Sequence, residues 1–169
     1  SCSSIDQINT LELSLHLSDL ERPKDLESLA ALLPKDLALK SANDFLVVSL
    51  ELLPKQKEEF YKKDFIPQVL SFFTFNHRYS EIKSTVNLLL PVPSEERAAL
   101  VTEINEWLPK TISMNSKNSI LKTYLTLSME ERALLRERTR VWDPQTIGGE
   151  ASRVEYEVIA IKAEKDASL

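Results

Sequence analysis

The sequence predicts an all-α protein, and within that class an α-helical solenoid of about four helix-hairpin repeats of 35–37 residues each. The first supporting observation is an internal repeat, because EERAALVTEINEWLPKTI at residues 95–112 returns 35 residues later as EERALLRERTRVWDPQTI at residues 130–147. Nine of the eighteen positions are identical. Similarity at such a period is typical of helical arrays in which each helix pair buries its apolar face against its neighbours.

Two further observations favour helices over strands. The chain of 169 residues contains two glycines, at adjacent positions 148 and 149, whereas the hairpin turns of a sheet protein need several. A leucine followed by serine or proline also recurs at steps of 36, 37 and 37 residues, at Leu17-Ser18, Leu53-Pro54, Leu90-Pro91 and Leu127-Ser128. Serine and proline favour helix starts, so these dipeptides predict the boundaries between repeats.

The boundaries divide the chain into a leading segment and four repeats. Residues 1–17 form the leading segment, and the repeats cover residues 18–53, 54–90, 91–127 and 128–169, the last with a C-terminal tail. Apolar residues spaced by three and four predict a leading helix, which is either a cap or part of another repeat. The alternating leucines at residues 11–17 also permit a strand there.

The first two repeats each predict a helix pair. In the first repeat, Leu26, Leu29 and Leu33 form the apolar stripe of a helix that Pro34 ends, and a second helix covers residues 43–53. In the second repeat, Pro67 falls within the first helix and predicts a kink there. The second helix of that repeat covers residues 79–90.

The third and fourth repeats follow the same plan. Apolar positions at 100–108 predict a helix that a proline ends, and a second helix covers residues 117–127. Ser94 and Ser128, each followed by paired glutamates, predict capped helix starts. Residues 152–168 alternate like a strand, but their place in the repeat predicts a helix. Trp107 and Trp142 occupy the same repeat position, so both are expected to be packing residues.

Composition excludes several classes of protein. Hydrophobic residues make up 43% and charged residues 28% of the chain, and no apolar run is long enough to cross a bilayer. These values predict a soluble protein without a transmembrane segment. The absence of an apolar leader indicates either a cytoplasmic protein, which is favoured, or a chain from which a leader was removed. The net charge of -5 and the pI of about 5.2 disfavour nucleic acid as a partner.

The residue types that carry chemistry are few. Cys2 is the single cysteine, and the two histidines, His16 and His77, have no other ligand at metal-binding spacing beside them. The two adjacent glycines are too few to form a glycine-rich phosphate-binding loop. The sequence therefore predicts no metal, no cofactor, no catalytic residues and no enzyme activity.

An aromatic run in the second repeat is the strongest irregularity of the array. It comprises Phe72, Phe73, Phe75, Arg78 and Tyr79. Exposed aromatic and arginine side chains anchor partners at protein interfaces, so these five residues are candidates for partner binding. The alternative is that the rings fill the core where the helix bends.

A basic stripe in the fourth repeat is the second candidate site. Arg132, Arg136 and Arg140 are spaced by four on one helix, with Arg138 close by. The stripe could dock an acidic peptide or a phosphate backbone. The alternative is a solvated helix face, because glutamates on the same helix can pair with the arginines.

These observations predict a non-catalytic helical repeat domain that binds another protein or a peptide and acts as an adaptor or scaffold. One alternative is a nucleic-acid-binding repeat that uses the arginine stripe, with an affinity that falls steeply with salt. Another is a purely structural spacer in a larger protein. The sequence leaves the oligomeric state open.

Overall fold

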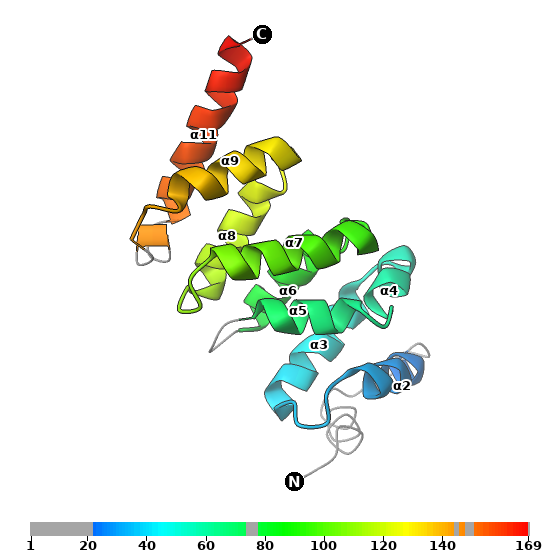
Figure 1. The fold of residues 1–169 in the computed structure, drawn as a ribbon. Helices are drawn as coiled ribbons and strands as arrows, with labels where there is room; N and C mark the ends of the chain where they lie inside the picture. The colour runs from blue at the N-terminus through cyan, green and yellow to red at the C-terminus, as the bar shows by residue number, and fades with distance from the viewer. Residues whose placement is uncertain (1–21, 74–77, 144–145, 148–150, 169) are drawn as a thin grey trace. The chain divides into compact units, whose positions relative to one another are not determined.

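The computed structural model describes residues 22–73, 78–143, 146–147 and 151–168 (Figure 1). These residues form α-helices and no β-strand, which confirms the predicted all-α class. The helices are α2 (Arg22–Leu32), α3 (Leu39–Glu51), α4 (Pro54–Phe60), α5 (Phe65–Phe72), α6 (Tyr79–Leu89), α7 (Ser94–Trp107), α8 (Met114–Tyr124), α9 (Met129–Thr139) and α11 (Ala151–Ala167). The predicted leading helix over residues 1–17 lies outside the described residues.

The chain divides into two compact units. The first unit comprises residues 1–71 and 78–90, and the second comprises residues 72–77 and 91–169. The main division, after Leu90, falls at a predicted repeat boundary. Each unit has its own buried apolar residues, so each is described separately.

In the first unit, α3 packs against both α2 and α6. Its core is rich in phenylalanine: the ring centroids of Phe45 and Phe60 lie 6.5 Å apart, and those of Phe60 and Phe65 lie 5.6 Å apart. All three side chains are fully buried. Complete burial of such a side chain contributes about 1.5–3 kcal/mol relative to exposure, so this cluster stabilises the first unit.

The predicted kinked helix in the second repeat is instead two short helices, which corrects the sequence-based expectation. Helix α4 ends at Phe60, residues 61–64 form turns, and α5 begins at Phe65. Pro67 is therefore the third residue of α5 rather than an interior residue of a longer helix. A proline is tolerated in the first turn, where its missing N–H would have no partner within the helix.

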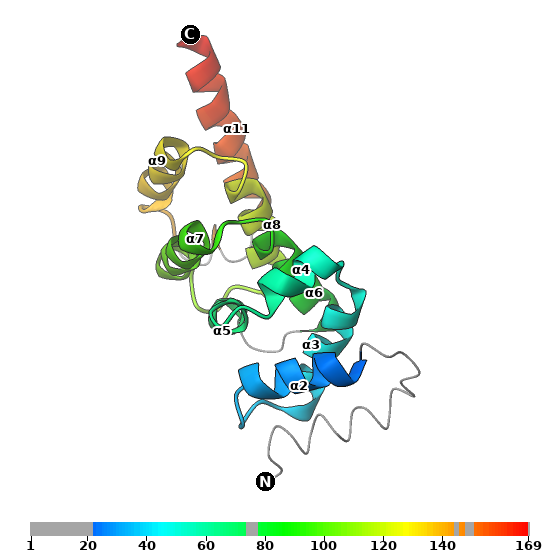
Figure 2. The ribbon, with the colours of Figure 1, turned by 90° about the vertical axis from the view of Figure 1, so that its right-hand side faces the viewer.

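In the second unit, α7 and α9 lie side by side in one layer, and α8 and α11 form a second layer (Figure 2). Helix α11 packs against both α8 and α9. The core of this unit is mainly apolar, and its buried side chains include Leu100, Ile104, Ile120, Leu121, Leu135 and Val158. The two copies of the internal sequence repeat contain most of α7 and most of α9, the two helices of the first layer.

The helix starts of the second unit partly match the predicted caps. Ser128 caps α9, because its Oγ accepts a hydrogen bond from the Glu131 backbone N–H at 3.2 Å and its own N–H donates to Glu131 Oε1 at 2.9 Å. This reciprocal pair is a capping box. Ser94 is not a cap, since α7 takes Pro93 as its N-cap and Ser94 is already the first helical residue.

The repeated arginine of the two sequence copies has a structural role in each. Arg97 is fully buried and donates from Nη1 to the Val92 carbonyl at 3.2 Å. Arg132 donates from Nε to the carbonyl of Tyr124, the last residue of α8, at 3.1 Å. The same carbonyl also accepts from the Leu127 backbone N–H at 3.1 Å, so Arg132 adds a second hydrogen bond at the C-terminal end of α8.

Candidate functional site

An open pocket of about 760 Å³ lies in the second unit and is the candidate functional site. Its lining comes from two stretches, one within residues 103–110 at the end of α7 and one within residues 136–147 at the end of α9. A volume of this order is typical of sites for small ligands or a few side chains of a peptide. Each copy of the sequence repeat therefore contributes part of the lining of one pocket, with Trp107 and Trp142 at equivalent positions.

Trp107 is a rigid part of the lining. Its ring stacks on the buried Tyr124 ring at a centroid distance of 5.5 Å, and its indole N–H donates to Thr139 Oγ1 at 2.8 Å. The Thr139 hydroxyl in turn donates to the Leu135 carbonyl at 2.8 Å. Trp107 is nevertheless only half-buried, so the tertiary contacts fix the ring while part of it remains accessible.

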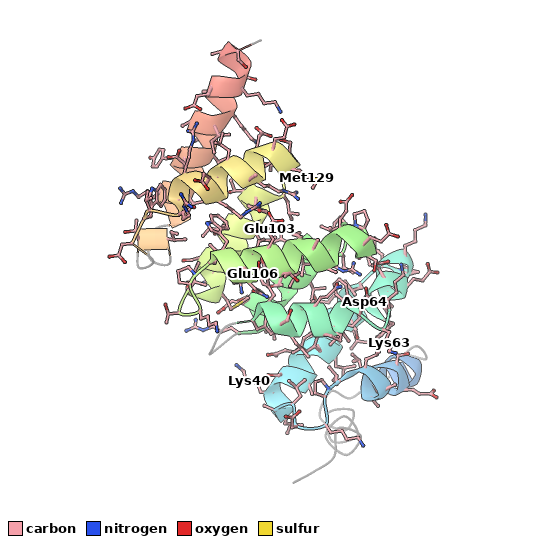
Figure 3. The ribbon with its side chains drawn as sticks, viewed as in Figure 1. Lys40, Lys63, Asp64, Glu103, Glu106 and Met129 are labelled. Atoms are coloured by element: carbon pink, nitrogen blue, oxygen red, sulfur yellow. The ribbon has the colours of Figure 1, made fainter. Side chains whose placement is uncertain are left out.

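A polar network lies behind Trp107. The Tyr124 hydroxyl donates to the Glu103 carboxylate, and Arg136 contacts both the carboxylate and the hydroxyl oxygen. Glu103 extends from α7 toward α9 (Figure 3). Burial raises the pKa of the Glu103 carboxyl, while the positive charge of Arg132 partly offsets this effect. The network links α7, α8 and α9, and within it the Arg136 guanidinium is paired with Glu103.

Trp142 is the second aromatic residue of the pocket. It lies 35 residues after Trp107 at the equivalent repeat position and is also half-buried. The Arg153 guanidinium lies over its ring at 5.2 Å, a cation–π contact. The expectation that both tryptophans are packing residues is therefore incomplete, because each makes a ring contact and also lines the pocket.

Charged side chains complete the lining. Lys110, Arg136 and Arg140 contribute three positive charges, and Glu103 and Glu106 contribute two negative charges. Glu103 and Arg136 pair with each other inside the network. Arg140 pairs with Glu137 at 2.9 Å, but both side chains are more than half exposed, and such surface pairs contribute little. Lys110 and Glu106 are exposed.

The four arginines of the predicted basic stripe do not share one surface. Arg132 lies over the Tyr124 ring at 5.1 Å and Arg136 contacts Glu103. Arg138 points to α11, where it pairs with Glu157 at 3.1 Å and also with Glu164. Only Arg140 is exposed. Three of the four guanidiniums thus hold neighbouring helices together, and Arg136 and Arg140 also line the pocket.

The predicted aromatic cluster is also divided. Phe72 is fully buried, which makes it a core residue rather than an exposed anchor, and Phe73 is half-buried. Phe75 lies outside the described residues. Phe72 and Phe73 belong to the second unit, whereas Arg78 and Tyr79 belong to the first.

Tyr79 is tied to an ionic pair in the first unit. Its hydroxyl donates to Glu51 Oε1 at 2.6 Å, and Lys83 pairs with the same carboxylate at 2.8 Å. Burial and the bond to Glu51 raise the pKa of Tyr79 to about 12. The hydrogen bond from Lys83, followed by that from Tyr79, lowers the pKa of Glu51. Arg78 is exposed.

The described residues contain no group of three or more histidine, cysteine, aspartate or glutamate side chains placed to hold a metal ion. None of the described helices combines the length and apolar character needed to cross a bilayer. His16 and His77 lie outside the described ranges.

Comparison with known proteins gives no family assignment: no family model, curated protein or solved structure matches the chain. The site is therefore interpreted from its own geometry.

Sequence reasoning missed Lys110 and the accessible sides of Trp107 and Trp142 as parts of one site. The signal was present, since the tryptophans are identical positions of the repeat. What the repeat alone did not indicate is that α7 and α9 lie side by side and leave a pocket between their ends.

Proposed function

We propose that this chain is a non-catalytic helical repeat domain that binds a peptide segment of another protein and acts as an adaptor or scaffold. The observation that carries the proposal is the pocket, in which a pair of repeat-equivalent tryptophans is accessible beside a charged rim. Tryptophan is enriched among the residues that dominate binding at protein interfaces.

The chemistry of the lining favours binding over catalysis. Among the described lining residues there is no serine, cysteine or histidine. The one hydroxyl, that of Thr139, bonds to Trp107 and to a backbone carbonyl. Glu103 is held by Tyr124 and Arg136. A nucleophile next to a free base, the arrangement that covalent catalysis needs, is therefore not present in this lining.

The proposal includes a solenoid arrangement of the helix pairs. Support comes from the sequence repeat, whose copies fall on α7 and α9, and from the packing of α11 against both α8 and α9 in the second unit. In such arrays the concave or grooved face between successive repeats is the usual binding surface. The pocket lies between successive sequence copies, as this model requires.

The test uses the full chain as bait in a lysate of its source cell, with and without nuclease, and a pocket variant, Trp142→Ala. The matched control is Tyr156→Ala on α11, because Tyr156 is 72% exposed and lies outside the pocket lining. We expect the wild type and the control to retain the same protein in both nuclease arms, and the Trp142→Ala variant to lose it. Circular dichroism checks that both variants remain helical.

Two results would contradict the proposal. Retention that disappears on nuclease treatment would favour nucleic acid as the partner. A bait that retains nothing, or that retains a protein equally well without Trp142, would favour a structural spacer or a different binding surface.

A further inference from the structure

We infer that the pocket binds an acidic peptide segment in which a bulky apolar side chain is flanked by one or two carboxylates. This inference rests on the proposed peptide-binding function and specifies the chemistry of the partner. Three features of the described residues support it: a fixed aromatic wall, two exposed cations in the pocket lining, and nearby carboxylates that would repel a polyanion.

The aromatic wall provides the apolar anchor point. Stacking on Tyr124 and the bond to Thr139 hold the Trp107 ring in place before any partner arrives. A side chain that does not have to be ordered on binding loses little conformational entropy. Trp142, Leu108 and Pro109 add apolar surface to the same pocket. An aromatic, leucine or proline side chain of the partner fits this lining.

The charges of the lining select the flanking residues of the partner. Glu103 and Arg136 neutralise each other within the network. Lys110 and Arg140 are then the two exposed cations of the lining, on a chain whose total charge is -5. Glu106 in the lining and Glu137 beside Arg140 are the exposed carboxylates next to them. Because Lys110 and Arg140 are exposed, they can meet a carboxylate without a large desolvation cost. Complementary charge of this kind sets specificity and the association rate.

A nucleic-acid strand fits the same surface less well. Its successive phosphates would pass close to Glu103, Glu106 and Glu137 as well as to the two exposed cations. Binding to a phosphate backbone depends on several cations that each neutralise a phosphate. A peptide can instead place a single carboxylate at Lys110 and Arg140 and keep the rest of its contacts apolar.

The two tryptophans make the pocket directly observable. They are the only tryptophans of the sequence, and both line the pocket. Intrinsic tryptophan fluorescence of the full chain therefore reports on occupancy of this site. The probes are peptides selected on the full chain from a random display library, each also synthesised with its acidic residues replaced by their amides, and a single-stranded oligonucleotide.

The charge-reversal variant is Lys110→Glu with Arg140→Glu. A matched control, Lys122→Glu with Lys165→Glu, makes the same change of net charge at exposed positions that do not line the pocket. We expect selected peptides to combine an apolar anchor with acidic residues and to bind about tenfold more tightly than their amide versions at low salt. The charge-reversal variant should lose this preference and select basic flanks, while the control keeps it.

The outcomes separate the two proposals. If no library peptide binds or changes the fluorescence, the peptide-binding function itself is wrong. If peptides bind at the tryptophans but show no acidic preference, or if charge reversal leaves the preference unchanged, the function stands and the acidic specificity is wrong. An oligonucleotide that displaces the peptide and binds more tightly would overturn the inference in favour of nucleic acid.

Discussion

At the scale of single residues, identical side chains in this chain have different roles because their neighbours differ. Arg97 and Arg132, equivalent in the repeat, both donate to backbone carbonyls near the end of the preceding helix. Arg138, two turns further along α9, instead pairs with carboxylates of α11, which raise its pKa above the usual value. Residue type alone therefore does not show whether an arginine connects two helices of the fold or is free to bind a partner.

Lys117 provides a prediction at this scale. Its Nζ donates to the Phe72 carbonyl at 2.6 Å and to Asn105 Oδ1 at 2.7 Å, and it lies 4.2 Å from the Phe72 ring centroid. These partners are uncharged, and burial lowers the pKa of Lys117 to about 8. Between pH 8 and the unfolded pKa, the unfolded chain binds the extra proton, so the free energy of unfolding rises with pH.

We therefore expect the free energy of unfolding to rise by about 2 kcal/mol from pH 8 to pH 10 through this group. The measurement is urea unfolding at several pH values for the wild type, Lys117→Met and, as a control, the exposed Lys122→Met. The rise should vanish only in Lys117→Met. The range stops at pH 10 because the raised pKa of Tyr79 lowers stability above it. Equal pH profiles for all three proteins would contradict the assignment.

At the scale of the elements, helix boundaries follow local chemistry where a cap or a proline is present. Pro54 is the first residue of α4, and Ser128 and Ser113 cap α9 and α8 through their side-chain oxygens. Pro67 illustrates the limit of this reasoning: a proline predicts that a helix is interrupted, but the chain placed the break several residues earlier, before Phe65. Phe60 and Phe65, on either side of the turn, are both fully buried.

The cap of α9 is a second prediction. Replacing Ser128 by alanine removes the acceptor for the Glu131 N–H and opens the capping box, so we expect a loss of about 1 kcal/mol in the free energy of unfolding. Ser119→Ala is the control, because Ser119 is exposed inside α8 and alanine favours a helix interior. Urea unfolding at constant pH measures both. A loss of equal size in both variants would contradict the role of the cap.

At the scale of the whole molecule, the chain contains two units with separate cores. The first is centred on phenylalanine rings, whereas the second is built from aliphatic residues between its two layers. The candidate site lies entirely in the second unit. A change in the core of the first unit should therefore leave the local stability of the pocket less affected than a change in the second.

Hydrogen exchange of the full chain tests this expectation. We expect Phe45→Ala to accelerate amide exchange in α2, α3 and α6 more than in α7, α8 and α9, and Leu121→Ala to give the reverse pattern, since each residue is fully buried in its own unit. Large-to-small changes of this kind cost about 2–5 kcal/mol. Uniform acceleration along the chain by either variant would show that the two units open as one.

The sequence alone predicted the helical class well, and for physical reasons. Helix formation depends on features that span only a few residues. These are the scarcity of glycine, apolar stripes such as that of Leu26, Leu29 and Leu33, and the cap at Ser128. For each candidate site the sequence left two interpretations open. Phe72 is core and not an anchor, and three stripe arginines tie helices together, because burial and pairing depend on residues distant in the sequence.

The amino-acid sequence by itself determined that the chain is helical and that residues 95–112 and 130–147 are copies of one pattern. The tertiary structure alone decided that these copies lie side by side and leave a pocket where Trp107 and Trp142 remain accessible. The reason is the range of the forces involved. Helix formation is set by neighbours three and four residues away, whereas a pocket exists only where separate helices pack without filling the space between them.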